Sequence, residues 1–162
     1  MTWMRFLAPT ASSSGPGFEI ALVTSRYQNY QAIEASGLLP VGTSRGRPRW
    51  KLPYRLHAII TPLAPSRDTF SIEDEMEFDV AYRAQLDATG IEAIRDHLEQ
   101  VNESGGHRGL VLLCFEDTSE LGEFSCHRRT FARWWQEQSG QEVPELPNPV
   151  DACPKALRRR NI

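Results

Sequence analysis

Gly109-Leu110-Val111-Leu112-Leu113-Cys114-Phe115-Glu116 is the stretch of sequence that decides the fold. Such a short apolar run, with glycine before it and acids after it, predicts a strand buried on both faces, as in a parallel sheet. Ser125-Cys126-His127-Arg128-Arg129 follows and leads into Thr130-Phe131-Ala132-Arg133-Trp134-Trp135, where aromatic residues recur at helical spacing. We therefore expect a buried strand, a loop, and a helix that begins beside a thiol, an imidazole and guanidinium groups.

The rest of the chain repeats this alternation of strands and helices. We expect further strands at 18–24, 38–43 and 56–63, helices at 27–36, 71–88 and from 91 to the glycine pair at 105–106, and a short strand at 142–146. Pro144 limits that last strand to an edge of the sheet, because proline cannot donate a backbone hydrogen bond. The pattern predicts an α/β fold, a compact three-layer Rossmann-like sandwich with a mainly parallel sheet of about five strands.

The composition fits a single globular domain. The chain has 162 residues and a formal net charge of -3. We expect a flexible leader at 1–17, a single α/β domain at 18–147 and a basic, mobile tail at 148–162. No stretch approaches the length of a membrane span, so no membrane contact is expected, and the oligomeric state stays open.

The cysteines and histidines predict neither disulfides nor a bound group. The three cysteines, Cys114, Cys126 and Cys153, form no CxxC pair and no even framework, which favours a reducing, cytoplasmic location. Cys114, inside the apolar strand, is interpreted as a small buried hydrophobic residue. Motifs such as GxGxxG, the P-loop and HExxH are missing from the sequence, so we expect no metal and no cofactor.

The loop between the second and third expected strands is rich in arginine and contains no acid. Its basic residues are Arg45, Arg47, Arg49, Lys51 and Arg55. Trp50 and Tyr54 are interleaved with them, and basic groups follow a phosphate backbone while aromatic faces stack on bases. The loop therefore predicts contact with a nucleic acid or nucleotide, with Arg45 and Arg47 on phosphate and Trp50 or Tyr54 on a base. A merely solvated loop is the alternative.

The predicted topology gathers candidate catalytic groups at one edge of the sheet. In an open α/β sheet the functional crevice lies at the carboxyl ends of the strands, where the basic loop, the turn at 65–68, Glu116 and the helix start would meet. Glu116 ends an apolar strand, and such a partly desolvated carboxylate suits acid–base or nucleophilic work. Its alternative role is an ion pair with Arg128 that only orders the loop.

The start of the expected helix offers a nucleophile and an anion binder. Cys126 and His127 lie where the helix dipole favours a thiolate, although Cys126 could simply pack under the loop. Adjacent residues on a helix point in different directions, so His127 is not automatically the base for Cys126. The planar guanidinium of Arg128 suits phosphate or carboxylate.

This constellation resembles the signature of the YeaO-like domain-of-unknown-function family (family 488), in which a strand ending in Glu116 is followed by Cys126-His127-Arg128. Arg47-Pro48, Leu63-Ala64-Pro65, and Tyr82 with Leu86 extend the resemblance over roughly 18–147. The resemblance implies a compact α/β domain in which the basic loop and the Glu116–Arg128 end share one site, and it implies no particular reaction. The loop after Glu116 is longer and more acidic than in that family, which would gate the site or repel a polyanion.

Together these features predict an enzyme that acts on a phosphate-bearing substrate, a nucleic acid or nucleotide. The specific reaction we expect is hydrolysis of a base–sugar bond, as in a DNA glycosylase, because a carboxylate and an aromatic slot meet its minimal needs. Two alternatives stay open: a non-catalytic module that binds the same anion, and a thiol-based enzyme that uses Cys126.

Overall fold

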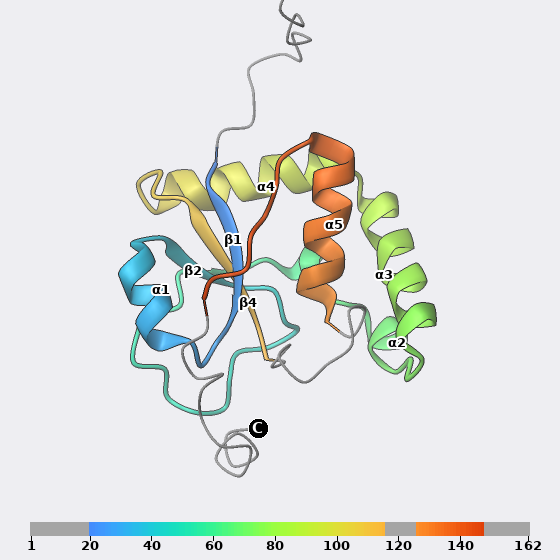
Figure 1. Cartoon of the computed structure of the whole chain (residues 1–162), viewed down its shortest axis with the longest axis horizontal. Helices are drawn as coiled ribbons and strands as arrows, with labels where there is room; N and C mark the ends of the chain where they lie inside the picture. The colour runs from blue at the N-terminus through green and yellow to red at the C-terminus, as the bar shows by residue number, and fades with distance from the viewer. Residues whose placement is uncertain (1–19, 116–125, 148–162) are drawn as a thin grey trace, which may run out of the picture.

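The computed structural model describes residues 20–115 and 126–147, which form an α/β fold around one parallel sheet. The strands are β1 (Leu22–Arg26), β2 (Leu39–Gly42), β3 (Ala58–Ile59) and β4 (Leu110–Cys114). Their order across the sheet is β1-β4-β2-β3, and every neighbouring pair is parallel (Figure 1). The predicted α/β class and the parallel sheet are therefore confirmed, and the apolar run that begins at Gly109 contains β4, one of the two inner strands.

Within residues 20–115 and 126–147 the sheet has four strands and not about five, because the segment expected as an edge strand at 142–146 pairs at a single point. Thr24 and Glu145 form one parallel bridge beside β1. The amide of Thr24 donates to the carbonyl of Pro144, and the amide of Leu146 donates to the carbonyl of Thr24. Pro144 has no amide hydrogen to continue the ladder, so the pairing stops at a bridge.

Five α-helices and one 3₁₀ turn connect these strands in the described part of the chain. They are α1 (Tyr30–Ser36), the turn η1 (Thr61–Leu63), α2 (Arg67–Phe70), α3 (Glu75–Thr89), α4 (Ile91–Ser104) and α5 (His127–Ser139). The helix expected from residue 71 begins at Glu75, because the Asp74 side chain accepts a hydrogen bond from the Glu77 amide and caps α3. The strand expected at 56–63 is shortened to β3 because Pro62 lies in η1.

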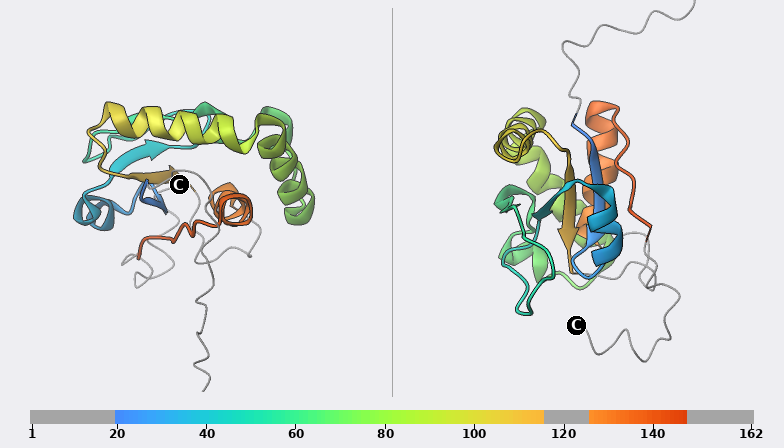
Figure 2. Two further views of the ribbon diagram at one scale, coloured as in Figure 1. Left: turned by 90° about the horizontal axis from the view of Figure 1, so that it is seen from above. Right: turned by 90° about the vertical axis from the view of Figure 1, so that its left-hand side faces the viewer.

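The helices cover both faces of the sheet. On one face, α1 and the loop after β2 pack around Val111 and Leu113 of β4. On the other face, α3, α4 and α5 pack around Leu110 and Leu112, with both α5 tryptophans in the core. Figure 2 shows α1 and α4 on opposite sides of the strands. The connection from β1 to β2 through α1 and the connection from β3 to β4 through α3 and α4 run in opposite directions across the sheet. Right-handed crossovers in opposite directions place their helices on opposite faces.

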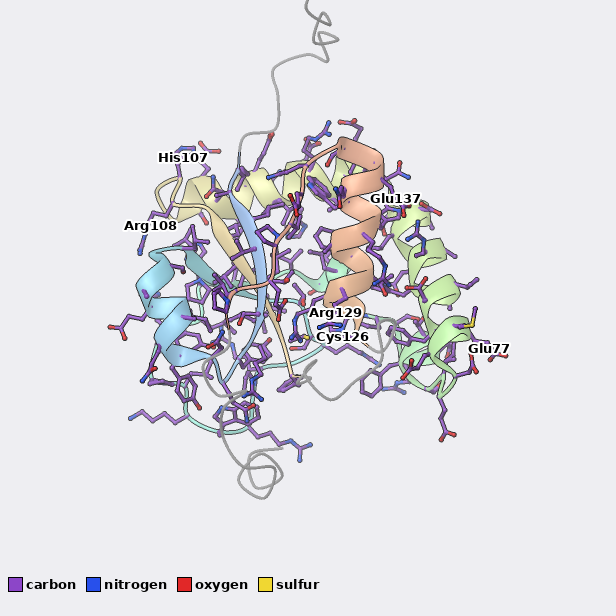
Figure 3. All side chains as sticks on the ribbon, viewed as in Figure 1. Glu77, His107, Arg108, Cys126, Arg129 and Glu137 are labelled. Atoms are coloured by element: carbon purple, nitrogen blue, oxygen red, sulfur yellow. The ribbon has the colours of Figure 1, made fainter. Side chains whose placement is uncertain are left out.

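One edge of the sheet collects the segments that carried the sequence predictions. Because all strands are parallel, the loops after β1, β2, β3 and β4 leave from the same edge. The first residue before α5, Cys126, also lies there, and Figure 3 shows Cys126 and Arg129 at that end of the helix. Within the described ranges, no helix combines the length and apolar character needed to span a membrane.

Candidate functional site

A pocket of about 440 Å³ opens at the carboxyl edge of the sheet, and we call it the edge pocket. Three segments supply its wall: the loop after β2, the turn and short helix after β3, and the junction between β4 and α5. The side chains that matter for its chemistry are Arg45, Arg47, Arg67, Phe70, Phe115 and His127. The predicted convergence of the basic loop, the 65–68 turn and the start of α5 is thus present in the structure.

The edge pocket is positively charged and partly aromatic. Arg45, Arg47 and Arg67 are exposed, and no carboxylate is found among the described residues that line the pocket. Phe70 is 66% exposed and Phe115 is 40% exposed, so both rings present apolar surface at the pocket. Guanidinium forks beside open aromatic faces suit an anionic ligand that also carries a flat ring.

The arginine loop is held in shape by a short chain of hydroxyl groups. The Ser44 hydroxyl donates to the Gly46 carbonyl at 2.7 Å, so Tyr27 Oη donates to Ser44 Oγ, also at 2.7 Å. Burial raises the pKa of Tyr27, which keeps this phenol protonated and able to donate. Gly42 is needed at the end of β2, because a Cβ there would lie 2.5 Å from the Tyr27 hydroxyl oxygen.

His127 forms the buried floor of the edge pocket and is fixed by the backbone. Its Nε2 lies 3.0 Å from the Thr43 carbonyl oxygen and 3.1 Å from Thr43 Oγ1. A carbonyl only accepts, so Nε2 carries the hydrogen and donates. The ring of Tyr82 meets the imidazole edge-on at a centroid distance of 5.7 Å. Nε2 is therefore a hydrogen-bond donor in this arrangement.

A second group of residues lies beside the edge pocket, and we call it the thiol–arginine cluster: the buried residues Cys114, Cys126 and Arg128, together with the more exposed Glu145. The two sulfur atoms are 3.1 Å apart. Arg128 Nη1 donates to Cys114 Sγ at 2.9 Å and to Cys126 Sγ at 3.4 Å. On the other side of the guanidinium, Nη2 and Nε donate to Oε1 of the Glu145 carboxylate, at 2.6 Å and 3.0 Å.

Charge in the thiol–arginine cluster is concentrated on one buried cation. Arg128 is only 2% exposed, and burial opposes its positive charge. The two cysteine sulfurs and Glu145 favour the charged form more strongly than burial opposes it, so the pKa of Arg128 is raised above its usual value. Burial, followed by the two cysteines, also raises the pKa of Tyr82. Arg128 is therefore a permanent cation that holds α5, β4 and the 142–146 segment together.

The predicted site residues fall into separate places. Arg45, Arg47 and His127 meet in the edge pocket, while Cys126 and Arg128 lie in the thiol–arginine cluster. Arg128 as an anion binder stays a prediction, and the carboxylate that the structure gives it is Glu145. Cys126 and His127 as catalytic groups also stay predictions. Glu116 lies outside the described residues.

The predicted stacking residues Trp50 and Tyr54 line a different hollow of about 250 Å³, which shares Arg47 with the edge pocket. Trp50 packs edge-on against Phe115 at a centroid distance of 5.8 Å. Tyr54 donates its hydroxyl to the Tyr27 carbonyl at 2.7 Å, and burial raises its pKa. Both rings support the loop, and their role in stacking on a base stays a prediction.

Sequence reasoning missed several residues that shape this region. Cys114 was expected to be an inert core residue, yet its sulfur contacts Arg128 and Cys126. Glu145 carried no local signal, because its role depends on pairing with β1, where Thr24 Oγ1 donates to its carboxylate. Arg26, which lies opposite Cys114 in the register of β1 and β4, is also buried. Phe70 follows the 65–68 turn, and its exposure became visible only in the folded chain.

Three possible metal ligands come together, although the sequence predicted none. Atoms of Cys114, Cys126 and His127 lie within 4.8 Å of one another. Two thiolates bound to zinc at about 2.3 Å would stand roughly 3.7 Å apart, wider than the 3.1 Å found here. The positive guanidinium of Arg128 already contacts both sulfurs. The donor set therefore fits a metal cation poorly in this arrangement.

Comparison of the chain with known protein families, with curated proteins and with solved structures found no match. The resemblance to the YeaO-like family therefore stays a prediction. Function has to be argued from the edge pocket and the thiol–arginine cluster themselves.

Proposed function

We propose that the edge pocket binds a phosphate-bearing ligand, a nucleotide or a segment of nucleic acid, and that the protein is an enzyme acting on it. One observation carries this proposal. Arg45, Arg47 and Arg67 come from two separate loops yet line one pocket, with no carboxylate among the described lining residues. Exposed arginines without acidic partners are suited to a ligand that brings its own negative charge.

The size and the rings of the edge pocket favour a nucleotide over a bare anion. A volume of about 440 Å³ lies within the usual range for small-molecule sites and exceeds what phosphate alone would fill. Phe70 and Phe115 offer the aromatic faces that Trp50 and Tyr54 were expected to supply. The hydroxyl chain from Tyr27 to Gly46 pre-organises the arginine loop, which lowers the entropy cost of binding.

The reaction we propose is cleavage of a base–sugar bond, with Glu116 as the acid–base or nucleophilic carboxylate. Glu116 directly follows Phe115, which lines the edge pocket. In Rossmann-like folds, ligands bind beyond the carboxyl ends of the strands, which supports a role for Glu116 at the edge pocket. Membership of the YeaO-like family and a cytoplasmic location belong to this proposal, and the reduced state of Cys114 and Cys126 agrees with a reducing compartment.

Binding of a fluorescein-labelled single-stranded DNA oligonucleotide, measured by anisotropy at two salt concentrations, tests the ligand class. We expect affinity to fall as salt rises, because the arginines replace counterions on phosphate. A phosphate-free nucleoside should compete poorly, and a nucleoside monophosphate should compete better. Absence of binding at low salt, or equal competition by nucleoside and nucleotide, would remove the proposal.

Glu116→Gln separates the enzyme from a non-catalytic binding module. If Glu116 acts on the ligand, the wild-type chain releases free base from a nucleotide or oligonucleotide, and the variant binds as before but releases none. A wild-type chain that binds tightly and releases no base under any condition tested is a binding module.

A thiol-based enzyme is the second candidate, favoured by the contact of Arg128 with both sulfurs. Rapid loss of turnover on treatment with iodoacetamide, with Cys126 as the alkylated residue, would support it. Full turnover after alkylation of Cys126 would exclude it.

A further inference from the structure

We propose that Cys114 and Cys126 are a redox couple, a pair of thiols that hydrogen peroxide converts into an intramolecular disulfide and that a thiol reductant restores. This modification site is separate from ligand binding in the edge pocket and does not depend on it. No sequence pattern paired these residues, because Cys114 was interpreted as a core residue and Cys126 as a candidate nucleophile.

The two sulfurs are brought together by well-anchored backbone. Cys114 ends β4, and its carbonyl accepts a hydrogen bond from the Tyr27 amide at 3.0 Å. Cys126 caps α5, and its carbonyl accepts from the Arg129 amide at 3.1 Å. A disulfide needs about 2.05 Å between sulfurs, so the 3.1 Å separation closes with a shift of roughly 1 Å. Neither α5 nor β4 has to move far for the bond to form.

Arg128 prepares the pair for oxidation. The reactive form of cysteine is the thiolate, and a neighbouring guanidinium stabilises negative charge on sulfur. Arg128 Nη1 lies within hydrogen-bond distance of both sulfurs, and Cys126 also lies at the positive end of the α5 dipole. At 3.1 Å a thiol hydrogen on one sulfur can point to the other sulfur. Once one thiol loses its proton, Arg128 balances the negative charge that forms on that sulfur.

Burial of the two sulfur atoms limits which oxidants can reach them. Cys114 and Cys126 are 0% and 1% exposed, so a bulky disulfide such as oxidised glutathione does not reach them in this conformation. His127 lines the edge pocket, and one of its ring nitrogens lies within 4.8 Å of both sulfur atoms. A molecule as small as hydrogen peroxide that enters the edge pocket and reaches His127 therefore comes close to both sulfurs.

The chemistry proceeds in two steps. The thiolate sulfur attacks one peroxide oxygen, the O–O bond breaks, and the departing hydroxide takes a proton and leaves as water, so this sulfur becomes a sulfenic acid. The second sulfur then attacks the sulfenic sulfur, the S–O bond breaks, and hydroxide leaves as water with the second thiol proton. In total, two thiols and one peroxide give one disulfide and two waters. Dithiothreitol reverses the change by thiol–disulfide exchange.

Peptide mapping of the full chain after peroxide treatment and alkylation of free thiols tests the proposal. Trypsin cleaves after Arg108 and Arg128, so the peptide 109–128 contains both cysteines, whereas Cys153 falls in another peptide. We expect peptide 109–128 to lose two hydrogen atoms in mass, to escape alkylation, and to recover both thiols in dithiothreitol. The matched control, Cys153→Ser, should behave like the wild type.

Single variants and a metal control sharpen the test. Cys114→Ser and Cys126→Ser should each form no internal disulfide and should leave a sulfenic acid that dimedone traps on the remaining cysteine. A disulfide that links peptide 109–128 to the peptide with Cys153 would overturn the proposal. Oxidation of both thiols to sulfinic acid without a disulfide would also overturn it, as would stoichiometric zinc that is retained by the purified chain and blocks peroxide. The wild-type peptide map decides the matter even if a serine variant fails to fold.

Discussion

The edge pocket and the thiol–arginine cluster lie side by side at one edge of the sheet, yet their arginines differ in exposure and in pairing with carboxylates. In the edge pocket, Arg45, Arg47 and Arg67 are exposed and receive no carboxylate from the described lining residues. In the thiol–arginine cluster, Arg128 is buried and satisfied by Glu145 and two sulfurs. An arginine that the fold has already paired stabilises the fold, and one that the fold leaves exposed can serve a ligand.

The largest expected effect is on stability, from Arg128→Ala. We expect the free energy of unfolding to fall by about 3 kcal/mol, near the lower end for broken buried ion pairs because the Glu145 side chain is 34% exposed. Urea unfolding followed by the fluorescence of the buried α5 tryptophans measures this change. The contrasting variant Arg47→Ala should cost less than about 0.5 kcal/mol, since its side chain is exposed. Equal losses in the two variants would erase the distinction between the regions.

Glu145→Gln probes the other side of the same ion pair. The amide keeps the shape of the side chain and one acceptor for Arg128 but removes the negative charge. We therefore expect the free energy of unfolding to fall by about 1.5 kcal/mol. Arg95 and Glu92 form an ion pair within α4 in which the Glu92 side chain is 75% exposed. Glu92→Gln is therefore the control and should cost less than Glu145→Gln in the same urea titration. A reversed order would show that Glu145 does not anchor α5.

A change of ligand affinity without a change of stability is expected in the edge pocket. Arg47→Gln should weaken binding of the DNA oligonucleotide by about tenfold, or roughly 1.4 kcal/mol, because one charge-assisted contact is lost. Arg49→Gln is the matched control, since Arg49 is exposed on the same loop and does not line the edge pocket. Anisotropy titrations of both variants check this. If Arg49→Gln weakens binding as much as Arg47→Gln, the loop acts only through its overall charge.

The smallest expected effect is on the pH dependence of stability. Burial raises the pKa of Tyr82, beside the thiol–arginine cluster, and of Tyr54, in the arginine loop. A raised pKa means that the folded state holds the phenol proton more tightly, so stability is complete below the unfolded pKa near 10 and falls as pH rises above it. At pH 10 the loss is about 0.4 kcal/mol for each tyrosine.

Tyr82→Phe and Tyr54→Phe separate these contributions, because each removes one hydroxyl that donates to a backbone carbonyl at 2.7 Å. Urea unfolding at neutral pH and near pH 10 should show a flatter pH dependence in both variants than in the wild type. If stability depends on pH in Tyr82→Phe as steeply as in the wild type, the Tyr82 phenol ionises as easily in the folded chain as in the unfolded one.

The parts of this fold that depend on local pattern could be predicted from the sequence. The apolar run at 109–116 became β4, and the aromatic spacing after Cys126 became α5, each within about two residues of its predicted bounds. The predicted start of α3 was wrong because Asp74 caps that helix, while residues 67–70 form the separate helix α2, which Ser66 caps. Parallel topology alone placed the basic loop and the start of α5 at one edge.

The contacts within the candidate site depend on partners that are distant in the sequence, and so they could not be predicted. Glu145 reaches Arg128 only because its segment pairs with β1 at Thr24. Cys114 resembles any apolar strand residue until β4 and α5 bring its sulfur beside Cys126. Trp50 interleaves with arginines along the chain, yet it turns toward Phe115 and supports the loop.

Oligonucleotide binding by the triple variant Arg45→Gln/Arg47→Gln/Arg67→Gln tests most directly the claim that the edge pocket is a phosphate site. Its free energy of unfolding, measured alongside, should match that of the wild type, since all three side chains are exposed. We predict that binding at low salt is lost and that the salt dependence disappears with it. A triple variant that folds normally and binds the oligonucleotide as tightly as the wild type would contradict the account.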